Sequence, residues 1–67
     1  MEDKQKICDL LLATLRETRS HGDMAALTYD KTAETVTISW APGGKRVVNV
    51  ACDSGTAMIR DIMRNVE

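Results

Sequence analysis

The apolar positions between residues 36 and 52 follow the pattern of two β-strands joined by a turn. Val36, Ile38 and Trp40 alternate with hydroxyl residues, so apolar and polar side chains repeat with a period of two. Segment 41–45 holds proline and two glycines, and segment 46–52 is again rich in β-branched residues. Two such runs around a Pro-Gly-Gly break predict a β-hairpin.

The preceding segment, 24–29, is predicted as a weaker strand, because its two alanines lower its β-propensity and a short helical segment competes with it. Pairing Tyr29 with Val36 and Leu27 with Ile38 leaves a loop of four residues, 31–34, which is a common hairpin length. In the third strand the more apolar parity is the one that sets Val48 opposite Trp40. The predicted floor of the core is listed here in full: Val36, Ile38, Trp40, Val48, Val50 and Cys52.

Apolar residues recur at helical spacing in segment 3–20. Ile7, Leu11 and Leu15 form one stripe, with Cys8 and Leu12 on one side of it and Leu10 on the other. This arc covers about 200°, whereas a surface helix needs about 100° to face a core. The surplus predicts either packing against a second helix, or a homodimer seam, or a groove for a partner. Gly22 is expected to end the helix in the left-handed conformation.

A second helix is predicted from Asp53 or Ser54, either of which caps its first turn, to about Val66. Its apolar residues lie within about 140° of arc. They are Met58, Ile59, Ile62, Met63 and Val66. The element order is therefore α-β-β-β-α in a single domain, 1–67. We expect an α+β fold of two layers, in which both helices pack on one face of a three-stranded antiparallel meander.

The opposite face of this sheet is predicted to carry small, mostly uncharged side chains. They are Met24, Ala26, Thr28, Thr35, Thr37, Ser39, Val47, Asn49 and Ala51. Two interpretations stay open, a solvated threonine-rich face and a surface that associates with another sheet or a partner. The candidate interaction surface combines this face with the surplus of the first helix. It consists of Leu10, Leu12, Thr35, Thr37, Ser39, Val47 and Asn49.

Charge and cysteine content narrow the functional classes. Nine basic and ten acidic residues are interleaved and give a net charge of −1, so nucleic acid is an unfavoured partner. The chain has no apolar run of membrane-spanning length and its first residues do not resemble a signal peptide, so a cytoplasmic location is expected. Cys8 and Cys52 are interpreted as reduced core residues, with a bridge between them as the lesser alternative.

No arrangement of side chains predicts catalysis or a bound cofactor, metal or small-molecule substrate. His21 does not lie at zinc-ligand spacing from a cysteine, and it is not part of a motif with a serine nucleophile. It is expected to be an exposed or capping residue. The acids are scattered, and the turn before the second helix carries Asp53 where an anion would bind. We therefore expect a protein that is not an enzyme.

Two resemblances add to this picture. The element order is similar to that of the double-stranded-RNA-binding domain, which implies nucleic-acid binding as an alternative function. That family has a lysine-rich cluster at the start of its second helix, whereas residues 53–57 carry no basic side chain here. The nucleic-acid contacts under this alternative would be Lys45, Arg46, Arg60 and Arg64. Segment 48–62 resembles the end of small uncharacterised proteins from genomes and prophages of gut Firmicutes, which implies a bacterial or phage accessory protein.

The sequence thus predicts a small non-enzymatic protein that acts through protein–protein contact, as a homodimer or with another protein. A nucleic-acid-binding module is the first alternative. A phage-encoded inhibitor of a host enzyme is the second.

Overall fold

The computed structural model describes residues 3–66 and has the predicted order of elements. Helix α1 (Lys4–Arg16) is followed by strands β1 (Met24–Asp30), β2 (Thr35–Trp40) and β3 (Lys45–Asn49), and then by helix α2 (Gly55–Val66). The strands form one antiparallel sheet in the order β1-β2-β3. The fold is α+β, as expected. Met1 and Glu2, which belong to the segment considered as a signal peptide, lie outside the described residues.

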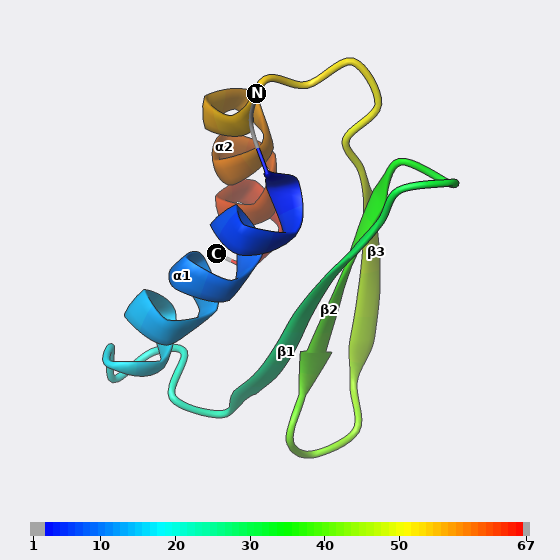
Figure 1. The fold of residues 1–67 in the computed structure, drawn as a ribbon. Helices are drawn as coiled ribbons and strands as arrows, with labels where there is room; N and C mark the ends of the chain where they lie inside the picture. Colours follow the sequence, from blue (N-terminus) through cyan, green and yellow to red (C-terminus); the bar gives the residue numbers. More distant parts are fainter. Residues whose placement is uncertain (1–2, 67) are drawn as a thin grey trace.

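Both helices lie on the same side of the sheet, and the other side has no helix over it (Figure 1). The core fills the space between the two layers. Its buried side chains are Cys8, Leu15, Met24, Leu27, Val36, Ile38, Val48, Val50, Met58 and Ile62. Ile7, Leu11, Leu12, Tyr29, Trp40, Met63 and Val66 are half-buried and pack against them. The stripe predicted for α1 therefore packs in the core, as do four of the five residues in the arc predicted for α2; Ile59 is not among the core residues.

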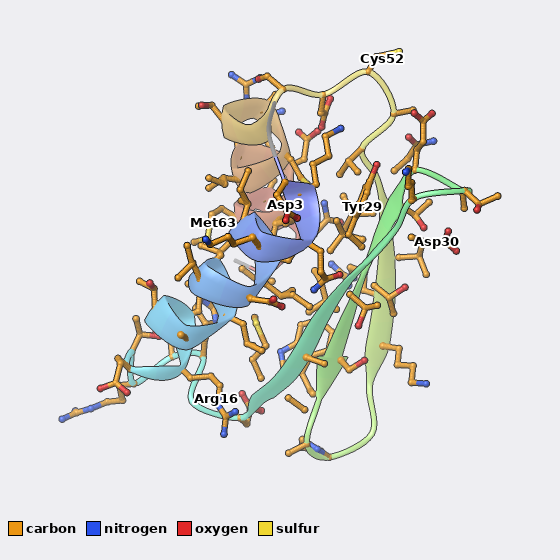
Figure 2. All side chains as sticks on the ribbon, viewed as in Figure 1. Asp3, Arg16, Tyr29, Asp30, Cys52 and Met63 are labelled. Atoms are coloured by element: carbon orange, nitrogen blue, oxygen red, sulfur yellow. The ribbon has the colours of Figure 1, made fainter. Side chains whose placement is uncertain are left out.

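The predicted pairing of β1 with β2 is confirmed. Tyr29 lies opposite Val36 and Leu27 lies opposite Ile38. The connecting loop is closed by the Asp30 carboxylate, whose Oδ1 accepts hydrogen bonds from the backbone N–H groups of Thr32 and Ala33 at 2.9 and 3.1 Å. Figure 2 shows the side chains of Tyr29 and Asp30 on opposite sides of the sheet, as the alternation along a strand requires.

A β-bulge in β1 corrects the predicted position of Met24. Met24 pairs with Trp40 and Ala26 pairs with Ser39, so Ala25 is an extra residue without a partner in β2. An extra residue reverses the alternation beyond it. Met24 is therefore not on the helix-free face but in the core, with 1% of its surface exposed.

The register of β2 with β3 also differs from the prediction. Val48 lies opposite Val36, not opposite Trp40. The backbone N–H of Trp40 donates to the carbonyl oxygen of Gly44 at 2.9 Å, so the hairpin closes over a loop of only Ala41, Pro42 and Gly43. Gly43 adopts a φ of 109°, which is accessible to glycine and strained for other residues. The face on which Val48 lies was predicted correctly, because the shift is an even number of residues.

The end of β3 corrects the predicted position of Cys52. The strand stops at Asn49, after which Val50 is still buried but Ala51 and Cys52 form a turn outside the sheet. Cys52 has a φ of 65° and is exposed, and Figure 2 shows it on the connection to α2, away from both layers. Strand alternation does not hold in a turn, so Cys52 is not a core residue and Ala51 is not part of the sheet face. Both cysteines are free, as expected, and Cys8 is buried as predicted.

Helix α1 is shorter than predicted. It ends at Arg16, and the Thr18 hydroxyl donates to the carbonyl oxygen of Leu15 at 2.6 Å and accepts from the N–H of His21 at 3.2 Å. These bonds satisfy groups that a longer helix would have used. Gly22 lies six residues beyond the helix and does not have a positive φ, so its predicted left-handed role is wrong. His21 is half-buried and takes part in this turn through its backbone.

Helix α2 begins where the sequence predicts. The Ser54 hydroxyl oxygen accepts a hydrogen bond from the N–H of Ala57 at 3.1 Å, so Ser54, and not Asp53, provides the side-chain cap. In the residues that the structure describes, no helix is long and apolar enough to cross a membrane.

Candidate interaction surface

The helix-free side of the sheet is built from three rows of cross-strand neighbours. The pairing places Ala26, Ser39 and Lys45 in the first row, Thr28, Thr37 and Val47 in the second, and Asp30, Thr35 and Asn49 in the third. We call these nine residues the open face. Five of the seven residues predicted as an interaction surface are among them: Thr35, Thr37, Ser39, Val47 and Asn49.

Charge on the open face is confined to two opposite corners. Lys45 stands at the β3 end of the first row and Asp30 at the β1 end of the third. The Asp30 carboxylate is turned to the loop that it closes. The middle row contains no charged residue, and Val47 in this row is 63% exposed. Charged residues are depleted at the centres of protein interfaces, and the middle row shares this absence of charge.

The two remaining predicted surface residues lie elsewhere. Leu10 is 62% exposed on α1, and α1 covers the opposite side of the sheet, so Leu10 is separate from the open face. Leu12 is half-buried and packs against the core. Part of its apolar surface is therefore already used inside the molecule.

A side chain of α1 bonds two backbone groups on the outer edge of β1. The Oε1 atom of Gln5 accepts a hydrogen bond from the backbone N–H of Tyr29 at 2.9 Å, and its Nε2 lies 3.4 Å from the carbonyl oxygen of Leu27. A primary amide offers an acceptor oxygen and two N–H donors, so one side chain can bond both a backbone N–H and a backbone carbonyl, as a neighbouring strand would. The Lys4 ammonium lies 5.6 Å from the centre of the Tyr29 ring and adds a cation–π contact at the same edge.

The outer edge of β3 has no such cover. In an antiparallel ladder the backbone groups of successive residues point alternately to the two sides of the strand. On the β2 side, the N–H of Trp40 donates to the carbonyl of Gly44, just before β3, and the N–H of Val50, just after β3, donates to the carbonyl of Glu34. The backbone groups of even-numbered residues along β3 therefore point to β2. The backbone groups of Lys45, Val47 and Asn49 therefore point outward. Within residues 3–66 no hydrogen bond reaches them. We call these outward groups the β3 edge.

The basic residues proposed as nucleic-acid contacts are divided between two sides of the molecule. Lys45 belongs to the open face, whereas Arg46 lies on the helix side, where its Nη1 donates to the carbonyl oxygen of Asn65 at 2.9 Å. A cation at the carbonyl end of a helix stabilises that end. Arg60 and Arg64 are exposed and lie one turn apart on α2. The structure therefore does not bring Lys45 together with the three arginines.

Sequence reasoning missed one pair of acids. A hydrogen bond with the Asp61 carboxyl raises the pKa of Asp53, and burial and the charge of Asp61 act in the same direction, against the charges of Lys4 and Arg60. The Oδ2 atom of Asp53 is closed off from solvent and has no hydrogen-bond partner within residues 3–66. The eight-residue spacing across a helix start gives no signal for such a pair in the sequence.

The buried thiol of Cys8 is expected to be unreactive. Burial, together with the neighbouring charge of Asp9, raises the pKa of Cys8 to about 11, so the thiol carries its proton at neutral pH. Among the described residues, no three histidine, cysteine or acidic side chains are placed to hold a metal ion.

Comparisons with known proteins add no relative to this description: a scan against protein-family models, a search of curated proteins and a search of solved structures found no match.

Proposed function

We propose that this protein is a non-enzymatic binding module that acts through protein–protein contact, with the open face as its binding surface. The observation that carries the proposal is the middle row of that face, Thr28, Thr37 and Val47, which is uncharged and has no helix over it. An antiparallel sheet commonly keeps one face solvated, and such a face usually carries charged side chains. Here the charge stands at the corners.

The side chains of the open face suit contact with another protein for a second reason. Threonine, serine and valine have few rotatable bonds, so ordering them at an interface costs little conformational entropy. The strands below hold them at fixed spacings. The free thiols Cys8 and Cys52 support a reducing compartment, and we propose the cytoplasm as the location.

Affinity capture with matched variants tests this function. Thr37→Arg places a charged side chain at the centre of the open face, and Ala13→Arg places the same side chain on an exposed position of α1. The tagged proteins are used at high dilution in lysate of the source cells. We expect wild type and Ala13→Arg to retain the same bound protein and Thr37→Arg to lose it. Equal retention by both variants would remove the open face as the binding surface, and retention by none of the three proteins would contradict the function.

A further inference from the structure

We propose that the β3 edge pairs with the β3 edge of a second copy of this chain, in antiparallel orientation around a two-fold axis at Val47. The asymmetry of the two sheet edges points to this place. Gln5 occupies two backbone groups on the outer edge of β1, the Tyr29 N–H and the Leu27 carbonyl, whereas the outward groups of Lys45, Val47 and Asn49 have no partner within residues 3–66. The proposal deepens the proposed function, because it assigns a partner to the same sheet.

The register follows from the position of the outward groups. Only odd-numbered residues of β3 can exchange hydrogen bonds across this edge. An axis at Val47 sets Val47 against its own copy and Lys45 against Asn49 of the second copy. All three outward residues of each chain are then paired, which gives about six hydrogen bonds between the copies. Moving the axis by one residue leaves either Lys45 or Asn49 without a partner in the strand.

Charge favours the same register. An axis at Arg46 would set that side chain directly opposite its own copy, and like charges in directly opposed positions destabilise a strand pair. With the axis at Val47, Arg46 faces Val48 of the second copy, and the apolar stem of the arginine can cover it. On the open face, the ammonium of Lys45 meets the neutral amide of Asn49. No pair of like charges is directly opposed.

The exposed apolar surface of β3 supports a second copy over an unrelated strand. Val47 is one of two large hydrophobic side chains that are mainly exposed among residues 3–66, and it lies at the point where the axis would pass. Pairing brings two such valines together, with Cα atoms about 5.5 Å apart. The result is a six-stranded sheet. Its open face is twice as large as that of one copy, and four helices cover its other face.

Substitution of Val47 by proline tests the pairing without breaking the monomer. The N–H of Val47 points outward and is not used in the sheet, and proline is tolerated on an edge strand when its missing N–H faces solvent. Val47→Thr is the matched control, because it keeps the N–H and the β-branched shape. Light scattering after size-exclusion chromatography gives the mass of each variant across a concentration series, and far-UV circular dichroism checks its fold.

We expect wild type and Val47→Thr to rise from the monomer mass of 7.4 kDa toward twice that value as concentration increases, and Val47→Pro to stay at the monomer mass. A wild-type monomer at high micromolar concentration would overturn the proposal. So would a folded Val47→Pro protein that dimerises as well as wild type.

Cysteine cross-linking tests the same pairing without the proline variant, and so does not depend on whether that variant folds. In a Cys52→Ser background, Val47→Cys places two thiols across the axis, at a Cα separation that a disulfide can span. Thr28→Cys is the control, because it lies in the same row on the opposite edge of the sheet. We expect mild oxidation to cross-link the first variant and not the second. Equal cross-linking of both, or of neither, would contradict edge pairing.

These outcomes are distinct from those of the capture experiment. Loss of capture by Thr37→Arg in a chain that stays monomeric would overturn the dimer and leave the proposed function standing. A Val47-dependent dimer with no captured protein would overturn the proposed function and leave the dimer standing.

Discussion

At the scale of single residues, folding changes the ionisation of Asp53. Its pKa is raised above the ordinary value of 3.8 by the hydrogen bond with Asp61, with burial as the second cause. The folded state therefore holds this proton to a higher pH than the unfolded chain does. The contribution to stability is fully present below the ordinary pKa and is lost as pH rises through the folded-state value.

Asp53→Asn should therefore stabilise the protein at neutral pH and have a smaller effect near pH 3.8, where the wild-type carboxyl already carries its proton. The asparagine amide can donate to Asp61 at every pH. Urea unfolding at the two pH values measures the difference. Asp23→Asn makes the same substitution at an exposed position and is the matched control. A stabilisation that grows toward acidic pH would contradict the raised pKa of Asp53.

Single residues also explain where sequence reasoning failed. Strict alternation placed Met24 on the open face, because the extra residue Ala25 leaves no mark in the pattern of apolar positions. The same alternation carried Cys52 into the core, although the strand ends three residues earlier. A bulge and a strand end are decided by backbone geometry, so a pattern with a period of two does not reveal them.

At the scale of elements, the contact between α1 and β1 distinguishes the two edges of the sheet. Gln5 provides this contact through two backbone groups of β1, and its Nε2 also donates to Oδ1 of Asp9 at 2.7 Å. A net hydrogen bond of this kind contributes about 0.5–1.5 kcal/mol to stability. Closing an edge in this way also denies it to a neighbouring strand.

Gln5→Ala should lower the free energy of unfolding by about 1–2 kcal/mol, because the N–H of Tyr29 and the carbonyl of Leu27 lose their partner. Lys6→Ala, one residue along the same helix and exposed, is the matched control and should change stability by no more than about 0.5 kcal/mol. Urea denaturation of both variants measures the comparison. Equal losses would mean that the edge contact contributes nothing specific.

The order of the elements and the pairing of β1 with β2 could be predicted because their signals are local. Alternation over five residues predicts a strand, apolar residues at helical spacing predict a helix, and the four-residue loop sets the first register. The second register failed because the Pro-Gly-Gly turn is tighter than expected. Which edge a helix side chain covers depends on how the layers pack, and nothing in the sequence around Gln5 indicates it.

At the scale of the whole molecule, the two helices leave one face and one edge of the sheet uncovered. The open face was largely predictable from the threonine and serine positions of β2. The β3 edge was not, because it is made of backbone groups that every strand has. Its significance comes from the comparison with the β1 edge. The two edges therefore differ in what lies beside their rows of backbone amides.

Hydrogen exchange of individual amides, measured at low and at high protein concentration, is the most direct test of the difference between the β1 and β3 edges. At low concentration the account predicts slow exchange at Tyr29, whose N–H donates to Gln5, and fast exchange at Lys45, Val47 and Asn49. At high concentration Val47 should become protected while Tyr29 is unchanged. A Val47 amide that exchanges as slowly as that of Tyr29 at low concentration, or one that gains no protection at high concentration, would contradict the account.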